Sequence, residues 1–420
     1  MPGLIRRLRA HFPGLFRTLR DFAARHFARQ LGIYPRPLAD EFGAVKRVLR
    51  SARWNMSGGN AHEGLEDDFA AYVDVPYAVA VNTGGMALQM SMRALGFKPG
   101  HEVLLQVDTC SATALAVMNA GCTPIFSDIS PQTFMMPSQA DALVGNNSRG
   151  LIATHMWGNP EDMAAMVQLG KQRGLAVIED ACLALGARSN GRAAGANGTV
   201  GVFSFGCLKP IQAGEGGMIV THDEALAREL RSLRHWGDRT LDYGLRDTTQ
   251  LAWNGRMSEI VAAVAREQLK GYAPYLRDLR DAVADFQRFL QDIEGLEVVM
   301  GAAASVQDCA FTQVVLRLDE NKLKHSKPRL REMLTARGIG TWHANFEAIT
   351  SLTFFKENAW RNWILSGDVA RAAENYSAAF PVHRQVYNHS GLGIAKTHFS
   401  SPWRLKELKA KLIECLADVQ

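Results

Sequence analysis

The stretch from residue 203 to residue 217 decides the fold, and it reads Phe203-Ser204-Phe205-Gly206-Cys207-Leu208-Lys209-Pro210-Ile211-Gln212-Ala213-Gly214-Glu215-Gly216-Gly217. One lysine stands in a short apolar segment that leads into a cluster of glycines. Burial in such a segment disfavours the ammonium form of a lysine and lowers its pKa. The neutral amine can then attack a carbonyl carbon. The alternative interpretation is a lysine that lies at a strand end and extends its charge into solvent. For an isolated lysine this alternative would be preferred.

A second segment shows that Lys209 is not isolated. The run Ala176-Val177-Ile178-Glu179-Asp180 is apolar and ends in two carboxylates, which predicts a buried strand with acidic groups at its end. A lysine of this kind paired with a strand-end carboxylate suggests a site for pyridoxal 5'-phosphate (PLP).

Composition and charge exclude several classes of protein. A chain of 420 residues is long enough for two to four domains, and 47% hydrophobic with 21% charged residues is typical of a globular protein. No apolar run reaches the roughly 18 to 20 residues of a transmembrane helix. The net charge of +5 is small for this length, so we expect no nucleic-acid partner. The six cysteines are scattered, which argues against a metal site and a disulfide framework and favours a cytoplasmic location.

The excess positive charge lies at the start of the chain. Residues 1–31 hold seven arginines against the single acid Asp21, and apolar residues from Leu15 to Leu31 recur at spacings of three and four. This pattern predicts an amphipathic helix. An extension that packs on the body or on a partner subunit is the favoured interpretation. A helix bound peripherally to a membrane is less favoured, and an organelle transit peptide fits least because serine is absent.

Beyond about residue 60, short apolar runs alternate with helical patterns. The expected strands cover residues 78–81, 102–107, 123–129, 150–157 and 175–179. Such continuous apolar strands, separated by helices, predict an α/β fold with a mainly parallel sheet covered on both faces. Ligands of such sheets bind beyond the carboxyl ends of the strands. We therefore expect the strand-end residues to meet at one edge, and these are Thr83, His155, Asp180 and Ser204.

Six blocks that follow one another in order carry a resemblance to a known family. The blocks are Val81–Leu88, Pro99–Val103, His155–Pro160, Glu179–Ala181, the Lys209 segment with Gly214–Gly217, and Asn254–Glu259. From about Trp54 to Leu296 the chain resembles the DegT/DnrJ/EryC1/StrS group of sugar aminotransferases, which are PLP enzymes of fold type I. The last hundred residues match this group more loosely.

The resemblance implies roles for the lysine and the aspartate. Lys209 occupies the position that forms the Schiff base with PLP and later shuttles the proton between substrate and cofactor. Asp180 occupies the position that pairs with the pyridine nitrogen and keeps it protonated. A helix N-cap is the alternative role for Asp180.

The resemblance also implies a phosphate site. The turn Thr83-Gly84-Gly85 precedes a helix whose N-terminal amides favour an anion, and Ser204 matches the phosphate-binding serine of the family. Asn254 matches an asparagine that reaches the phosphate from the neighbouring subunit, which would make the site a property of a homodimer. Its alternative is a turn asparagine. Arg256 is a candidate substrate or phosphate contact, with a structural ion pair as an equal alternative.

Three positions depart from the family pattern. Gly85 stands where the family usually has threonine or serine, so a hydroxyl contact to the phosphate is missing. Cys110 stands where an aromatic ring would stack on the cofactor, and Leu183 replaces the histidine or glutamine near the 3-oxygen of the cofactor. Each loss is expected to weaken cofactor binding by roughly 1 to 3 kcal/mol. A small residue that makes room for a bulky group is our preferred interpretation of Cys110, ahead of a reactive thiol.

The chain is expected to form a basic extension over residues 1–50, a large PLP-binding domain over 51–285 and a smaller α+β domain over 286–420. In the small domain Trp342, His343, Asn345 and His383 are candidate substrate contacts by position only. For a lone histidine, a role in the core or at the surface is the more common alternative.

Three hypotheses about function follow. The leading one is a homodimeric PLP-dependent aminotransferase that moves an amino group from glutamate or glutamine to a keto-sugar, a nucleotide-linked keto-sugar or a cyclitol. The second is PLP chemistry other than transamination, such as elimination or condensation. The sugar dehydratases of the family replace the lysine by histidine, so Lys209 argues against that branch. The third is a non-catalytic regulatory protein on the same scaffold.

Overall fold

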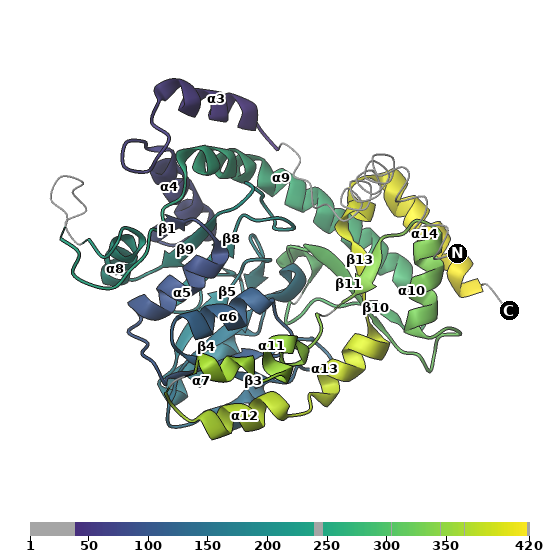
Figure 1. Ribbon diagram of the computed structural model, residues 1–420. Coiled ribbons are helices and arrows are strands. Elements are labelled where there is room, and N and C mark those ends of the chain that lie inside the picture. The colour runs from purple at the N-terminus through teal and green to yellow at the C-terminus, as the bar shows by residue number, and fades with distance from the viewer. Residues whose placement is uncertain (1–37, 239–246, 304, 345, 365, 418–420) are drawn as a thin grey trace, which may run out of the picture.

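The computed structural model describes residues 38–238, 247–303, 305–344, 346–364 and 366–417. A seven-stranded sheet forms the centre of the molecule (Figure 1). Its strands are β1 (Tyr77–Val81), β2 (Glu102–Gln106), β3 (Thr123–Ser127), β4 (Ser148–Thr154), β5 (Ala176–Asp180), β8 (Val200–Ser204) and β9 (Gly217–Thr221). They lie in the order β1-β9-β8-β5-β4-β2-β3, and β9 alone runs against the others. The predicted α/β fold with a mainly parallel sheet is confirmed.

Helices cover both faces of this sheet, which explains why its strands are apolar along their whole length. One face packs against α5 (Gly84–Ala94), α6 (Ser111–Asn119) and α8 (Glu224–Arg234). The opposite face packs against α4 (Ala61–Val73), α7 (Met163–Arg173) and the first half of α9 (Glu259–Leu290). Outside this layer α3 (Glu41–Ser51) lies on α9, and β6 (Arg188–Ser189) pairs with β7 (Arg192–Ala193).

A second, antiparallel sheet follows in the sequence. Its strands β10 (Leu296–Val298), β11 (Gln313–Leu318), β12 (Thr341–His343) and β13 (Gly391–Ala395) lie in the order β10-β11-β13-β12. The second half of α9 packs on it together with α10 (Lys327–Ala336) and α14 (Pro402–Ala417). Because α9 contributes to both cores, it connects the two sheets through one continuous element.

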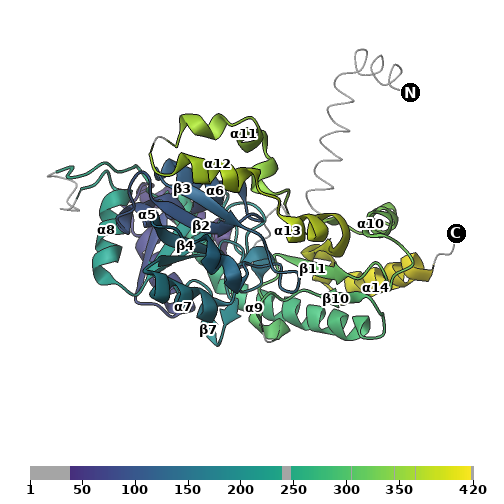
Figure 2. The same ribbon diagram turned by 90° about the horizontal axis from the view of Figure 1, so that it is seen from below.

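Part of the C-terminal third returns to the large sheet. Figure 2 shows α11 (Thr353–Lys356) and α12 (Val369–Ser377) above the sheet, on the side opposite α7. Trp360, between them, is fully buried in the same core as α5 and α6. The side chain of Asn375 donates to the carbonyl of Phe126 (2.9 Å) and accepts from its amide (2.8 Å). A domain boundary near residue 286 stays a prediction. Residues 349–380 follow it in the sequence, yet they pack in the core of the large sheet.

The strands begin and end within a few residues of the expected positions. Helix α7 begins at Met163, because the Asp162 carboxylate accepts the amide of Ala165 (3.1 Å) and caps it there. Helix α9 begins at Glu259 and continues through Pro274. None of the helices in the described ranges combines the length and hydropathy that crossing a membrane requires. The basic helix predicted within residues 1–31 lies outside the described residues.

Candidate active site

The carboxyl ends of the parallel strands form one edge of the large sheet, and the candidate residues gather there. Asp180 ends β5, Ser204 ends the neighbouring β8, and Thr83 follows β1. Thr83 also bridges to Gly216, next to the start of β9 at the same edge. Strand direction therefore brings together residues that lie more than a hundred positions apart in the sequence.

The turn after β1 forms a tight cradle at the start of α5. Thr83 is the N-cap of this helix, and its hydroxyl accepts a hydrogen bond from the amide of Met86 (3.0 Å). A Cβ atom added to Gly84 would lie 2.7 Å from Cβ of Ser204 and 3.2 Å from Sγ of Cys182. At Gly85, in contrast, an added Cβ would meet nothing closer than Oγ1 of Thr83 at 4.0 Å. Gly84 is required by close packing, whereas Gly85 leaves open space.

The carboxylate of Asp180 is held in a fixed orientation. Asp180 is 6% exposed, and its Oδ2 accepts a hydrogen bond from Oγ1 of Thr113 in α6 (2.8 Å). Its Oδ1 accepts from the backbone amide of Cys182 (3.2 Å). Asp180 pairs with Thr154 across β4 and β5, so the two side chains leave the sheet on the same face.

Lys209 and Asp180 both influence the same residue, Cys182. Burial, and then the carboxylate of Asp180, raises the pKa of the Cys182 thiol, while the charge of Lys209 opposes this shift. Lys209 itself is half-buried, and it follows Leu208, which adopts a left-handed backbone conformation (φ 64°). The carboxylate, the thiol and the amine are thus near enough to interact electrostatically.

The three departures from the family pattern lie around this site in different ways. Cys110 is exposed at the N-terminus of α6 and contributes to the electrostatic environment of Cys182. Leu183 is partly buried and packs on the apolar cluster that contains Trp157. Its position does not supply a polar group to the site.

His155, expected at the same edge, is fully buried in a separate network. Its Nδ1 accepts the amide of Glu161 (2.9 Å), so Nε2 carries the hydrogen and donates to Glu179 (3.0 Å). The Glu179 carboxylate also accepts backbone amides from the 195–198 turn, including those of Gly195 (2.8 Å) and Gly198 (2.6 Å). The hydrogen bonds from these groups outweigh burial and lower the pKa of Glu179. This network fixes the strand ends beside Asp180 from the opposite face of the sheet.

Asn254 and Arg256 lie near the cradle but make different contacts. The backbone carbonyl of Asn254 accepts a hydrogen bond from the side chain of Asn82 (3.3 Å), and Asn254 is exposed. Within the described part of the chain, the side-chain amide of Asn254 forms no hydrogen bond. The guanidinium of Arg256 stacks on the ring of Trp236 at 4.0 Å and lies 2.8 Å from Nδ1 of His235.

The small-domain candidates are engaged by their own surroundings. Both ring nitrogens of His343 have partners, Arg331 (3.1 Å) and the carbonyl of Tyr387 (3.1 Å). Burial lowers the pKa of His343 and of His383. His383 contacts the carbonyl of Phe346 (3.0 Å) and, with Arg384 and Tyr387, lines a hollow of about 420 Å³. Trp342 lies in β12 on the backbone of Gly393, and Asn345 is outside the described residues.

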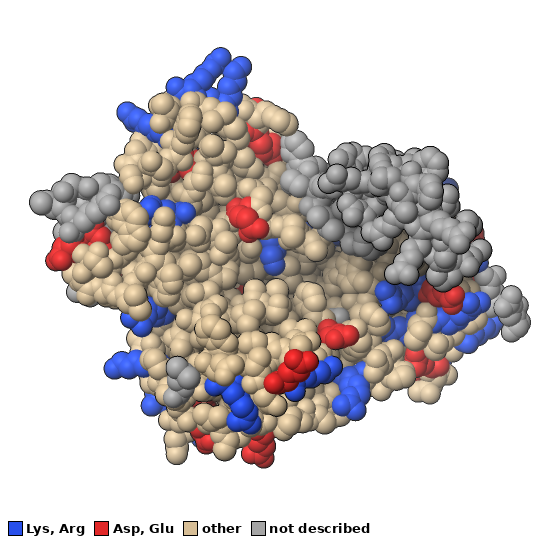
Figure 3. Space-filling model, viewed as in Figure 1, with Lys and Arg blue, Asp and Glu red and all other residues tan. Residues whose placement is uncertain are grey.

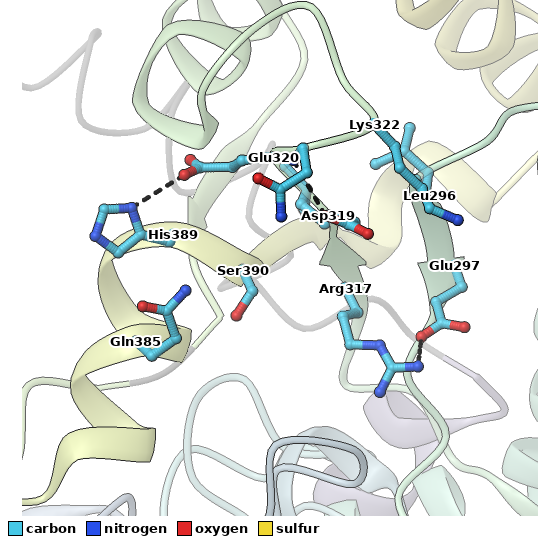
Figure 4. A pocket seen from close by; sticks show the side chains of 12 residues that line it. Leu296, Glu297, Arg317, Asp319, Glu320, Lys322, Gln385, His389 and Ser390 are labelled. Carbon is cyan, nitrogen blue, oxygen red and sulfur yellow. Dashed lines mark hydrogen bonds and ion pairs between the residues drawn. The ribbon is translucent and has the colours of Figure 1, made fainter.

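A larger hollow of about 600 Å³ lies at the edge of the small sheet (Figure 4). Its charged side chains pair with one another, as Arg317 does with Glu297 and His389 with Glu320 (3.0 Å). None of the candidate cofactor residues lines it. Figure 3 shows charged side chains gathered over this part of the molecule and few of them over the middle of the large domain.

Comparison with known proteins identifies the chain. The family model described as the DegT/DnrJ/EryC1/StrS aminotransferase family matches residues 37–386. The chain belongs to this aminotransferase family. A dTDP-3-amino-3,4,6-trideoxy-alpha-D-glucose transaminase of Streptomyces venezuelae is 35% identical over 72% of this chain and 77% of its own length. A UDP-N-acetyl-3-dehydro-alpha-D-glucosamine 3-aminotransferase of Acidithiobacillus ferrooxidans is 32% identical over 73% and 79%.

Solved structures agree with the family assignment. The chain of DesV from S. venezuelae, in complex with a ketimine intermediate, superposes with a TM-score of 0.76 at 28% identity and covers 91% of this chain and 95% of its own. An aminotransferase from Psychrobacter cryohalolentis gives a TM-score of 0.78 at 26% identity, covering 89% and 95%. The expected fold type I architecture is therefore confirmed.

PLP is the cofactor of this aminotransferase family, and the residues of this chain fit it. The cradle at Gly84 admits no side chain, and the start of α5 presents backbone amides that suit a phosphate. Among the described residues, the buried atoms Oδ1 of Asn82 and Oγ1 of Thr154 have no hydrogen-bond partner. Both atoms lie beside the cradle or Asp180, where a polar ligand would satisfy them.

Two residues of the site could not be expected from the sequence. Thr113 is the second hydrogen-bond partner of Asp180, yet it stands in the first turn of an apolar helix without a motif. Asp108 accepts the amide of Phe346 (3.1 Å) and thereby attaches the small-domain loop to the end of β2. The only feature of the sequence that points to Asp108 is its position directly after the strand expected over residues 102–107.

Proposed function

We propose that this family member is an aminotransferase that binds PLP through the Thr83–Gly85 turn, Asp180, Ser204 and Lys209. The observation that supports it most is that both Asp180 and Lys209 act electrostatically on the thiol of Cys182, at the edge of the sheet where Gly84 meets Ser204. An amine near a buried carboxylate matches what PLP requires of a protein.

PLP supplies an electron-accepting ring that stabilises negative charge on a substrate carbon. The residues of this chain have the remaining tasks. The amine of Lys209 binds the cofactor and then moves a proton at Nζ. The carboxylate of Asp180, oriented by Thr113 and by the amide of Cys182, holds a proton on a ring nitrogen. Ser204, Thr83 and the first amides of α5 orient the phosphate.

For the substrate we propose a keto-sugar, free or nucleotide-linked, or a cyclitol, with glutamate or glutamine as the amino donor. The names of the two relatives quoted above support a nucleotide-linked sugar. The hollow lined by His383, Arg384 and Tyr387 adjoins the loop that Asp108 holds, and it offers a place for the distal part of such a substrate. Arg256 and His343 are proposed substrate contacts of lower rank, because other side chains already engage them.

We propose a homodimer in which Asn254 reaches the phosphate of the neighbouring subunit. The exposed position of Asn254 and its side-chain amide support this. Apolar side chains beside the site are also exposed, among them Leu208 next to Lys209 and Leu115 in α6. A cytoplasmic location belongs to the same proposal, supported by the six free cysteines. Contact of residues 1–31 with a membrane surface stays a prediction.

The test is the reaction of the purified protein with PLP. We expect a visible absorbance band that borohydride converts into a stable adduct on Lys209, located by peptide mass spectrometry. Lys209→Ala abolishes both signals. Lys98→Ala serves as the matched control, because Lys98 lies in the loop before β2, at the amino-terminal edge of the sheet. A wild-type protein that stays colourless and yields no adduct would contradict the proposal.

A second outcome separates the enzyme from a regulatory homologue. A protein named "Pleiotropic regulatory protein" from Geobacillus stearothermophilus is 32% identical over 71% of this chain, which keeps a non-catalytic function as the second candidate. Glutamate should convert the cofactor of wild-type protein to its amine form in a single turnover. Retention of the original band with every amino donor would instead favour the regulatory function or a PLP reaction other than transamination.

A further inference from the structure

Thr113 is the third residue of α6, and its side chain bonds to a residue outside this helix. The hydroxyl of a helical threonine can otherwise bond the carbonyl four residues earlier. Here Oγ1 of Thr113 donates instead to Oδ2 of Asp180, 67 residues away, at 2.8 Å. Oγ1 of Thr113 in turn accepts from the hydroxyl of Thr109 (3.3 Å).

This chain of hydroxyls is closed off from water. Thr109 and Thr113 are each 1% exposed, and Asp180 is 6% exposed. Hydrogen bonds in such surroundings strengthen one another, and a bond to an ionised group is stronger than one between neutral groups. Asp180 Oδ1 has its own donor, the amide of Cys182, so both carboxylate oxygens are fixed and the plane of the carboxylate is determined.

We propose that Thr113 is a positioning residue for Asp180, and that Thr109 supports it. The pair orients the carboxylate so that its remaining lone pairs face a protonated heteroaromatic nitrogen. This inference rests on the proposed function. It adds residues that act through Asp180 and do not themselves touch the ligand.

The hydroxyl chain also explains how the carboxylate of Asp180 keeps its orientation. Cys110 supplies no stacking ring and Leu183 no polar side chain, so the contact at the ring nitrogen carries more of the recognition. A hydroxyl that holds Oδ2 prevents the carboxylate from rotating away when no stacked aromatic ring fixes the ligand.

The test compares Thr113→Val with Thr113→Ser in the full-length protein. Valine keeps the shape of threonine and removes the hydroxyl, whereas serine retains it. We expect Thr113→Val to weaken PLP binding about tenfold, and Thr113→Ser to stay within about threefold of wild type. Thr109→Val should have a smaller effect, because its bond is longer and reaches Asp180 only through Thr113. Dissociation constants come from absorbance titration of the cofactor-free protein.

A second measurement separates positioning from a merely structural role. With 15N-labelled PLP, the pyridine nitrogen of Thr113→Val should lose part of its proton and its resonance should move downfield, and serine should restore it. Thr335→Val is the matched control, since it removes a similar hydroxyl pair with Thr341 (2.9 Å) in the small domain. It should leave the resonance unchanged.

The outcomes distinguish this inference from the proposed function. If wild-type protein binds no PLP, the proposed function fails and the inference with it. If wild-type protein binds PLP and Thr113→Val shows the same affinity and the same 15N resonance, only the positioning role is refuted. A loss of Tm in Thr113→Val with an unchanged resonance would likewise refute it and leave Thr113 a structural residue.

Discussion

At the scale of the residue, two adjacent glycines of the cradle have different reasons to be glycine. A Cβ at Gly84 would overlap Cβ of Ser204, an atom attached directly to the backbone of β8, so the overlap is not relieved by a side-chain rotation. A Cβ at Gly85 would point into space that extends at least to Oγ1 of Thr83, 4.0 Å away. The first glycine is dictated by packing and the second is not.

We therefore expect opposite results from the same substitution at the two positions. Gly84→Ala should destabilise the protein by about 1 to 3 kcal/mol and weaken PLP binding, because β8 has to move. Gly85→Ala should leave stability unchanged or raise it by up to about 1 kcal/mol, since alanine favours the helix that begins here. Thermal unfolding and PLP titration of both variants measure this. Equal losses in the two variants would contradict the geometry of the cradle.

The hydroxyl that the family usually has at the position of Gly85 can be restored by a substitution. Because the added side chain has room, Gly85→Ser should supply the hydroxyl that the family usually places there. We expect PLP to bind about three- to tenfold more tightly, the range of one ordinary hydrogen bond. Titration of the cofactor-free variant gives the dissociation constant. Gly85→Ala is the control, because it adds the Cβ without the hydroxyl and should not tighten binding.

Single residues differ in how far the sequence foretells them. Lys209 and Asp180 stand in recognisable segments, both act electrostatically on Cys182, and their roles stay predictions. Thr113 could not be foreseen, because its partner lies in a distant strand and its own helix is largely apolar. His155 was expected at the site from its position at a strand end, but its side chain bonds to Glu179 in a separate network. The position of a residue at a strand end does not determine the direction of its side chain.

At the scale of the element, the connection between β4 and α7 contains a buried acid. Glu161 is 1% exposed and accepts the backbone amides of Met136 (3.1 Å) and Asp162 (3.1 Å). Burial outweighs these bonds and raises the pKa of Glu161 to about 8. The folded protein thus holds a proton that an unfolded chain releases near 4.5, the ordinary value for glutamate.

This raised pKa predicts the direction of a pH effect. The contribution of Glu161 to stability is complete below about pH 4.5 and is lost as the pH rises through about 8, because the native state binds the extra proton in this range. Glu161→Gln removes the titration. The stability of wild type relative to this variant should fall by up to about 1.4 kcal/mol per pH unit between pH 5 and 8. Denaturant unfolding at several pH values checks it, and a difference independent of pH would show that Glu161 does not titrate there.

The elements themselves were largely predictable, and the exceptions have physical reasons. Apolar strands between helical patterns specify a parallel sheet, because both faces must be buried. Pro274 lies inside α9, although proline usually ends a helix. Proline removes one helical hydrogen bond and clashes with the preceding turn, but a helix packed along both domains retains enough contacts to continue.

At the scale of the whole molecule, the placement of Asn254 leads to a test of the dimer. Lys209→Ala and Asn254→Ala should each be nearly inactive alone. If Asn254 acts across the interface, mixing the two variants creates dimers with one intact site. Activity should then recover to about a quarter of wild type after subunit exchange. Absence of recovery, in dimers shown by mass to be mixed, would place Asn254 in its own subunit's site.

The return of the C-terminal segment to the large sheet gives a second prediction for the whole molecule. Trp360 is fully buried in the large-domain core, whereas Trp363, three residues later, is 66% exposed. Trp360→Ala should cost about 3 to 5 kcal/mol, and Trp363→Ala should cost little. Thermal unfolding of both variants measures the difference. Similar small effects would mean that residues 349–380 do not complete this core.

The sequence could not predict this arrangement, because an amphipathic pattern shows that a face is buried and not what buries it. Residues 353–377 resemble any pair of short helices, and they were expected in the small domain. Their partner is instead β3, some 250 residues earlier, through the bonds between Phe126 and Asn375.

This long-range contact has a consequence for synthesis of the protein on the ribosome. At roughly 5 to 20 residues per second, β3 emerges about 12 to 50 seconds before the segment that covers it. During that interval the nascent large domain exposes the apolar surface on which Phe355, Trp360 and Tyr376 will pack. The enzyme should therefore depend on chaperones during translation, and its native core can close only when nine-tenths of the chain has been made.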